Sequence, residues 1–391
     1  MLLRAWPALL LAALAAAAQA APFTPRSDNE VVEWLPATTD PSVRRVESLR
    51  RQLAARPDDA QLRLEIARRY FDLAMAQGDP RFVGYAMAAI GPLEKAAAGD
   101  AHYWLVRGQL QQYSHDFAGA LASLDKASQL DPQMVEPPAW RAAIRMVQAR
   151  YNDAEAECGR LFAIADMLLA RGCSAYVQAN TGQLQQAYDG LVSLLAITPQ
   201  VDPGLLLWLK TRQAEMAIRL GRNDDAEKHF KQALATGITD QFLLGAYADF
   251  MIARGRPKDA LALLKGWERS DILLLRLALA GKDAKDPRAA DWARQLRERF
   301  ADAQRRGDRL HEQEAARFAL DIEGDAARAL QLAGNNYTVQ KEPRDAEILM
   351  RAALAAQQPA AAQAAVEWFH RNSYQDAAMQ KLVRQLEGAP R

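Results

Sequence analysis

Small residues recur through the middle of the chain in two parallel rows, and apolar residues surround them at helical spacing. The rows are Gly108, Ala142, Ala175, Ala214 and Ala248, and, twelve residues later, Ala120, Ala154, Ala187, Ala226 and Ala260. Subtracting neighbouring numbers within a row gives spacings of 34, 33, 39 and 34 residues. A period of about 34 residues is that of a helix–turn–helix unit stacked on its copies, and small side chains are needed where its helices cross closely. The pattern predicts an all-α array of helix pairs that turn near residues 115, 150, 182, 221 and 255.

The clearest unit runs from residue 100 to residue 132. Its first helix carries an aromatic and a small residue, its second helix has apolar residues at helical spacing, and Asp131-Pro132 ends it. This unit resembles the tetratricopeptide repeat. The matching positions are Trp104, Gly108, Phe117, Ala120, Ala127 and Pro132, whereas Arg107, Gln111 and Leu124 depart from the family pattern. The resemblance implies a tetratricopeptide-like α-solenoid, a right-handed superhelix of antiparallel helix pairs.

The repeats keep their register beyond this unit but weaken toward both ends. Gly182, Gly221 and Gly255 follow first helices, where a left-handed residue stops a helix at little cost. A loop insertion at 198–204 accounts for the 39-residue interval. We expect the best repeats at 100–265 and degenerate ones on either side, which together form a helical array over 41–387, followed by a tail at 388–391. The outer helices are expected at 41–55, 62–70, 82–97, 272–280, 289–304, 310–322, 326–335, 343–356, 359–372 and 376–386.

The N-terminus has the features of a secretory signal peptide at 1–20. Arg4 precedes an apolar run from Ala8 to Ala18, and Ala18-Gln19-Ala20 is a cleavage pattern, with cutting expected after Ala20. The run is shorter than the ~20 residues a membrane span needs, so we expect no stable membrane insertion after cleavage. Residues 21–40 lack a helical period and form an arm, which is either partly ordered or docked in cis through Val32, Trp34 and Leu35. The mature protein is predicted to be exported, either periplasmic or secreted.

Composition and motifs argue for a protein without catalytic chemistry. The formal net charge of +1 lacks the basic excess typical of nucleic-acid binders. The five histidines are dispersed, and no metal-ligand, Gly-rich phosphate or nucleophile motif occurs, so no enzyme, metal or cofactor is expected. His311, Glu312 and Glu314 are interpreted as a solvated helix face, and Asn336-Tyr337-Thr338 as a chance match to the glycosylation sequon.

Cys158 and Cys173 are the two cysteines of the chain. In an oxidising compartment they are candidates for a disulfide, and two buried thiols are the alternative.

Proteins of this family line their groove with the first helix of each unit, at positions other than those of the core. Transferred by the resemblance, these positions fall on His102, Gln109, Gln112, Tyr113, Tyr176, Asn180, Trp208, Thr211, Glu215, Phe242 and Asp249. We call this set the inner strip. It is polar and aromatic, as a peptide-binding groove requires, or else it is an ordinary solvated face. Lys and Arg are largely absent from it, which disfavours capture of a C-terminal carboxylate.

Three functions are compatible with these sequence features. The leading one is a non-enzymatic scaffold of a Gram-negative periplasm that binds a protein or peptide in its groove. The alternative is a spacer or accessory subunit of an envelope assembly, which uses its convex face or termini. The third is a glycan-cleaving solenoid, for which Glu215 and Asp249 are the candidate carboxylates.

Overall fold

Apolar periodicity and strong N-caps turn nearly all of the described chain into helices. The structure is a computed structural model, and it describes residue 27 and residues 40–388. The expected signal peptide, its cleavage site and most of the arm lie outside the described residues. The helices are α2 (Pro41–Ala55), α3 (Ala60–Gln77), α4 (Arg81–Ile90), α5 (Ala101–Tyr113), α6 (Phe117–Leu130), α7 (Glu136–Val147), α8 (Tyr151–Ile164), α9 (Met167–Ala179), α10 (Leu184–Ala196), α11 (Pro203–Arg219), α12 (Asn223–Leu234), α13 (Gln241–Ala253), α14 (Pro257–Leu263), α15 (Asp271–Ala284), α16 (Ala289–Arg305), α17 (Glu312–Phe318), α18 (Ala326–Tyr337), α19 (Pro343–Ala355), α20 (Gln363–Arg371) and α21 (Ala377–Glu387).

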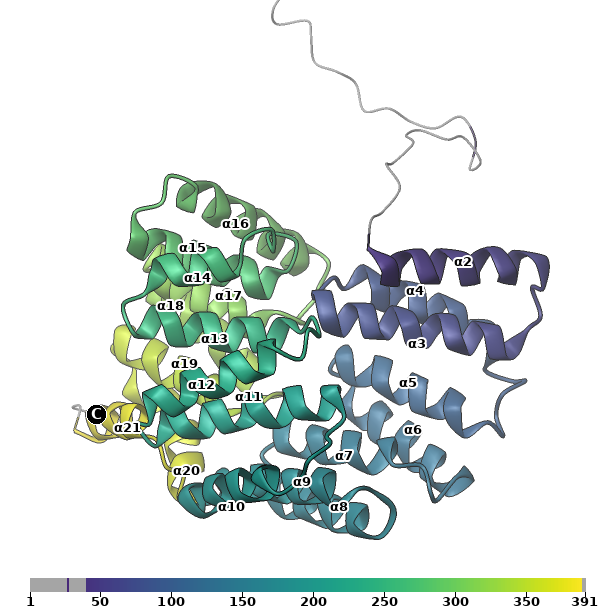
Figure 1. Ribbon diagram of the computed structural model, residues 1–391. Helices are drawn as coiled ribbons and strands as arrows, with labels where there is room; N and C mark the ends of the chain where they lie inside the picture. The colour runs from purple at the N-terminus through teal and green to yellow at the C-terminus, as the bar shows by residue number, and fades with distance from the viewer. Residues whose placement is uncertain (1–26, 28–39, 389–391) are drawn as a thin grey trace, which may run out of the picture. The chain divides into compact units, whose positions relative to one another are not determined.

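Consecutive helices pair as the sequence predicts, and α5–α6, α7–α8, α9–α10, α11–α12 and α13–α14 are the five pairs that carry the rows of small residues (Figure 1). Their turns fall at 114–116, 148–150, 180–183, 220–222 and 254–256, which confirms the expected positions. No strand occurs among the described residues. From residue 45 onward the helical array lies within one compact unit.

Local chemistry explains where helices begin and end. Aspartate N-caps recur, for example Asp100, whose Oδ1 accepts a hydrogen bond from His102 N at 2.8 Å. Gly182, Gly221 and Gly255 have φ angles of +84°, +73° and +70°, as expected for residues that stop a helix in the left-handed region. In the two preceding pairs the corresponding turn uses His115 or Ala149, whose φ angles are +59° and +55°.

The two rows of small residues are the helix-crossing points. All ten are buried, and Ala120, Ala154, Ala214, Ala226, Ala248 and Ala260 have no exposed surface. A Cβ added to Gly108 would lie 2.8 Å from Leu124 Cγ. Leu124, one of the residues that depart from the family pattern, therefore fills the space that the glycine leaves. The repeats therefore pack through alternating small and large residues.

The outer repeats are helical where expected, but three helices are interrupted. Helix α4 continues into the 3₁₀ turn η1 (Gly91–Leu93), and α20 is preceded by the 3₁₀ turn η3 (Pro359–Ala362). The expected helix at 310–322 is α17 followed by a π-helical turn, η2 (Ala319–Glu323). None of the described helices is both long and apolar enough to span a membrane.

The C-terminal repeats share a core with the middle of the array. One hydrophobic cluster contains Tyr151, Cys158 and Val177 together with Leu349 and Trp368. Trp368 Nε1 donates a hydrogen bond to Tyr151 Oη at 3.1 Å across 217 residues of sequence. The last helices therefore pack against α8 and α9 rather than extending away from them.

Candidate functional site

The structure divides the inner strip into a part that the chain itself occupies and a part that stays accessible. The occupied part lies on α9, α11 and α13, and the accessible part is His102 on α5 with the pocket that Tyr113 lines. Gln109, Gln112 and Tyr113 are themselves half-buried. His102 is exposed and Phe242 is half-buried, whereas Asn180 and Thr211 are 2% and 3% exposed.

On α9 and α11 the polar groups of the strip are paired within the chain. Tyr176 Oη accepts a hydrogen bond from Arg212 Nη1 at 3.0 Å, and the guanidinium lies 5.0 Å from the tyrosine ring centroid. Arg212 also pairs with Glu215 at 2.9 Å. Asn180 Nδ2 donates to Tyr176 O at 2.7 Å. Trp208 packs edge-on against Tyr176, so these aromatic rings contribute to the core.

Asp249 on α13 is a structural hub. Its Oδ2 accepts from Arg276 Nη2 at 2.8 Å and from Arg276 Nε at 3.1 Å, and its Oδ1 lies 2.8 Å from Arg317 Nη1. Burial alone would raise the pKa of Asp249, but the two guanidinium groups outweigh it and hold the pKa below its ordinary value. Asp249 thus joins three successive first helices, α13, α15 and α17.

The turn between α20 and α21 covers the ends of α9 and α11. Leu184 N donates to Gln375 Oε1 at 2.9 Å, and Arg219 Nε donates to Gln375 O at 3.0 Å. The Arg219 guanidinium also lies 4.0 Å from the ring centroid of Tyr374. No local sequence signal marks these contacts, because 156 to 191 residues separate the partners.

The accessible part of the strip ends at a pocket of about 640 Å³, which we call the Tyr113 pocket. One face of α4 supplies Pro80, Val83 and Met87, and the α16–α17 loop supplies Leu310. The remaining lining residues are Gly84, Tyr113, Ser114, His115, Gly307, Asp308, Arg309, Glu312, Asn336 and Val339. The volume is within the range of ligand-binding pockets, and the lining combines apolar side chains with the charged side chains of Asp308, Arg309 and Glu312.

Electrostatics in this pocket keep its two titratable rings neutral at pH 7. Burial, followed by the carboxylates of Asp79, Asp271 and Asp308, raises the pKa of Tyr113 to about 12. Burial, together with the charge of His311, lowers the pKa of His115 to about 4. On the strip beside the pocket, the buried Oε1 of Gln112 has no hydrogen-bond partner among the described residues. The pocket therefore offers two uncharged rings beside Asp308 and the Arg309–Glu312 ion pair, and it suits a segment with both apolar and polar groups.

The prediction that His311, Glu312 and Glu314 form a solvated helix face is wrong for His311 and Glu314. Glu314 and His311 have 8% and 14% exposed side chains and pair at 3.7 Å, because α17 packs inside the array. Burial would lower the pKa of His311, but Glu314 outweighs it and raises that pKa. Burial alone would raise the pKa of Glu314, but the neighbouring His311 outweighs burial and lowers this pKa to about 2. Glu312 is half-buried and pairs with Arg309 at 2.8 Å.

Asn336 is not an accessible glycosylation site. It is 3% exposed, and its Nδ2 donates to Asp345 Oδ1 at 2.9 Å. Within the described chain, no group of three His, Cys, Asp or Glu side chains could hold a metal ion.

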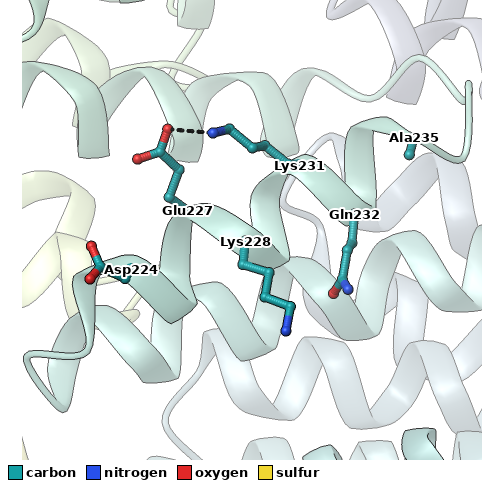
Figure 2. A pocket seen from close by; sticks show the side chains of 6 residues that line it. All are labelled: Asp224, Glu227, Lys228, Lys231, Gln232 and Ala235. Carbon is teal, nitrogen blue, oxygen red and sulfur yellow. Dashed lines mark ion pairs between the residues drawn. The ribbon is translucent and has the colours of Figure 1, made fainter.

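A second hollow, which the sequence did not indicate, lies along α12 (Figure 2). It measures about 500 Å³ and is lined by Asp224, Glu227, Lys228, Lys231, Gln232 and Ala235. Glu227 pairs with Lys231 at 3.0 Å and with Arg256 at 2.8 Å, so the negative charge of Glu227 in this hollow is already balanced within the chain. Since all of its walls come from one helix, it is a shallow surface feature.

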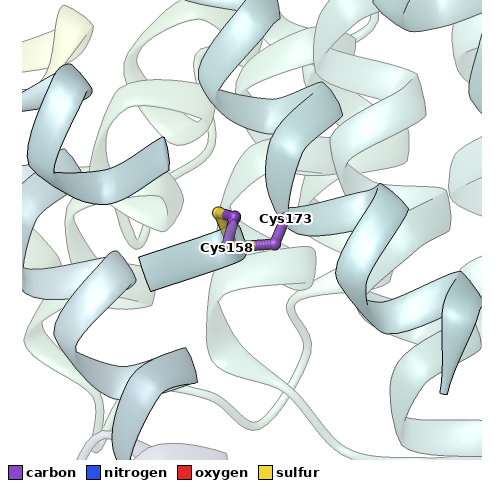
Figure 3. The surroundings of a disulfide bond; sticks show 2 residues. All are labelled: Cys158 and Cys173. Carbon is purple, nitrogen blue, oxygen red and sulfur yellow. A yellow bond between two sulfur atoms is a disulfide. The ribbon is translucent and has the colours of Figure 1, made fainter. Parts of the chain in front are cut away.

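Cys158 and Cys173 form a disulfide between α8 and α9 (Figure 3). Their Cα atoms are 5.5 Å apart, and Cys158 is fully buried. The bridge joins neighbouring repeats beside the core that the C-terminal helices share.

Comparison with known proteins supports the fold. No protein-family model matches the sequence, and no curated protein matches it. The chain is similar to the crystal structure of the APC/C hetero-tetramer Cut9–Hcn1, with a TM-score of 0.51 at 11% identity, over 84% of this chain and 63% of that chain. It therefore spans less than two thirds of that relative.

Two further structures resemble the chain more weakly. PilW, a type IV pilus biogenesis factor, has a TM-score of 0.39 at 20% identity and covers 56% of this chain and 99% of its own. The P58(IPK) TPR domain has a TM-score of 0.26 at 14% identity and covers 84% of this chain and 97% of its own. Scores this low carry no argument by themselves. The helix pairs, the buried rows of small residues and the likeness to Cut9–Hcn1 together give this chain a tetratricopeptide-like α-solenoid fold.

Proposed function

We propose that this protein is an exported, non-enzymatic scaffold that binds a protein segment at the Tyr113 pocket. The observation that carries the proposal is the division of the inner strip. Its α9–α13 part makes hydrogen bonds and ion pairs with the chain's own helices, whereas Tyr113 lines an open pocket with apolar walls. Tetratricopeptide-like arrays commonly present such surfaces to partners, which supports this assignment at the level of the fold.

Helix α4, which lines the pocket, carries exposed side chains of the kinds found at interfaces. Met87 on the pocket-lining face is 46% exposed, and Tyr85, elsewhere on α4, is 51% exposed and packs against Tyr70 at 5.3 Å between ring centroids. Aromatic residues and methionine are enriched at the cores of protein interfaces, because they bury a large area at little entropic cost. A partner side chain inserted between α4 and the α16–α17 loop would cover Met87 on one side and Leu310 on the other, beside the charged Arg309.

Export rests on the sequence of residues 1–20 and on the disulfide, since disulfides persist in oxidising compartments. The glycan-cleaving alternative is disfavoured by the state of its two carboxylates. Asp249 is held by two arginines that outweigh its burial and lower its pKa, so it is not available as a general acid. Burial raises the pKa of Glu215, but its carboxylate is engaged with Arg212 at 2.9 Å.

Site-specific photocrosslinking in the cell envelope tests the proposal. A photoreactive amino acid at Met87 should capture one discrete partner, and Tyr113→Ala should weaken that capture by about 1–2 kcal/mol without changing Tm. The matched control places the same amino acid at Val192, which is 37% exposed on α10. Equal capture at both positions, or capture at neither, would favour the spacer function instead.

The same experiment separates binding residues from structural ones. Tyr176 contacts two core clusters and Arg212, so Tyr176→Ala should lower Tm. A variant that loses capture with an unchanged Tm identifies a contact residue, and Tyr176→Ala should not behave in this way.

A further inference from the structure

Helix α2 carries a concentrated positive charge that pairs with none of the acidic side chains the structure describes. Its 15 residues include four arginines, Arg44, Arg45, Arg50 and Arg51, and one acid, Glu47. All four arginines are exposed, and none makes an ion pair or a side-chain hydrogen bond with a described residue. The whole chain has a formal charge of +1, so the rest of it is net negative.

The arginines surround the exposed side of the helix. Val46 and Leu49 are 1% and 5% exposed and form the packed side. At 100° per residue, Arg45 and Arg50 flank this buried stripe, and Arg44 and Arg51 lie opposite it. No large apolar side chain is exposed on α2. The surface is therefore cationic without an apolar centre.

We infer that the α2 surface docks on a bilayer that contains anionic phospholipid headgroups. Protein interfaces are depleted of charge at their centre and need a desolvated apolar core, which α2 does not offer. A surface for single-stranded nucleic acid would usually add aromatic side chains for base stacking, and α2 has none. Arginine forms bidentate hydrogen bonds with phosphate, and attraction to a fluid anionic surface needs no fixed geometry.

The expected contact is peripheral and electrostatic. Each basic residue near an anionic membrane strengthens binding by about fivefold, so removal of two should weaken it by about thirtyfold. The attraction should also disappear at high salt, because the screening length falls to about 3 Å at 1 M.

Vesicle flotation tests the inference on the chain from residue 21 onward, which keeps every described residue. We expect binding to phosphatidylglycerol–phosphatidylethanolamine vesicles and none to phosphatidylcholine vesicles. Arg50→Gln/Arg51→Gln should weaken binding by about thirtyfold. The control Arg254→Gln/Lys265→Gln removes the same charge from exposed residues elsewhere and should bind nearly as wild type does.

Three outcomes would overturn the inference. Equal loss in both double variants would mean that net charge alone drives the binding. Equal binding to neutral vesicles would mean an apolar contact. Retention by DNA or by an acidic protein, without vesicle binding, would assign the surface to another class of partner. Because the Tyr113 pocket is untouched in these variants, partner crosslinking at Met87 should persist whatever the vesicles show.

Discussion

Asp249→Asn is the most direct test of how the inner strip is used. The substitution keeps the shape of the side chain but removes the charge that Arg276 and Arg317 share. Arg276 is 4% exposed, and it also donates a hydrogen bond to the carbonyl oxygen of Ile272, which has no net charge. The variant would therefore leave a buried guanidinium without its counter-charge.

The size of the effect follows from this geometry. Removing one partner of a buried ion pair costs about 3–5 kcal/mol. The Asp249 side chain is 29% exposed, and Arg317 keeps Asp321 at 3.6 Å, so we expect about 2–4 kcal/mol. An unfolding entropy of about 2.1 cal/mol/K per residue over the described chain converts this to a fall in Tm of about 3–6 °C.

Thermal unfolding followed by circular dichroism measures the shift. Asp283→Asn is the control, since Asp283 is exposed and has no ion pair with a described residue. The pKa of Asp249 is lowered, so its stabilisation is full above about pH 4 and is lost as the pH falls through the folded-state pKa. The difference in Tm between the wild type and Asp249→Asn should therefore become smaller at acidic pH. If Asp249→Asn melts like the control at pH 7, Asp249 is a free groove residue and the hub assignment is wrong.

Three further predictions concern turns, the disulfide and pH. Gly221→Ala should lower the free energy of unfolding by about 1–2 kcal/mol, because the φ angle of Gly221 is +73°. Gly190 lies within helix α10 with no atom near its missing Cβ, so Gly190→Ala should raise the free energy of unfolding by about 0.5–1 kcal/mol. Urea unfolding compares the two variants, and equal effects would contradict the requirement for a left-handed residue at 221. Cys173→Ala should lower stability by about 3 kcal/mol, and thiol titration of the denatured, unreduced wild type should find no free thiol; two titratable thiols would reject the bridge. The His311–Glu314 pair should stabilise the fold fully between about pH 4.3 and 6.5. The pKa of His311 is raised, so its contribution is lost as the pH rises, and the pKa of Glu314 is lowered, so its contribution is lost as the pH falls. His311→Gln should remove the loss of stability at alkaline pH, and an unchanged dependence of stability on pH would refute the pairing.

Local features of this fold could be predicted because their causes lie within one repeat. The rows of small residues, the aspartate caps and the glycine turns each act over a few residues, and the five predicted turns are where the structure has them. The π-helical turn η2 has no such local signal. It lets Asp321 face both Arg317 and Arg351, which lie on different helices, so its cause is tertiary.

The occupation of the inner strip could not be predicted, because repeat geometry does not say how later repeats meet earlier ones. The contact between Gln340 and His115 spans 225 residues, with Gln340 Nε2 2.9 Å from His115 Nδ1. Lys341 N donates to Val147 O at 2.7 Å in the same region. Such pairings depend on small rotations between successive repeats, summed along the array, and those rotations leave no mark in any single unit.

Residue type alone does not separate a partner-binding groove from an internal interface, since both use aromatic rings with amides and hydroxyls. The contacts of the individual side chains separate them here. The Thr211 hydroxyl donates to Leu207 O at 2.8 Å and the Asn180 amide donates to Tyr176 O, so both donors are used within their own helices. Tyr113, in contrast, lines an open pocket between α4 and the α16–α17 loop. A partner side chain would enter that pocket without breaking the hydrogen bonds of Asn180 and Thr211 or the ion pairs of Asp249, and that is why we place the partner at α5 rather than along the whole strip.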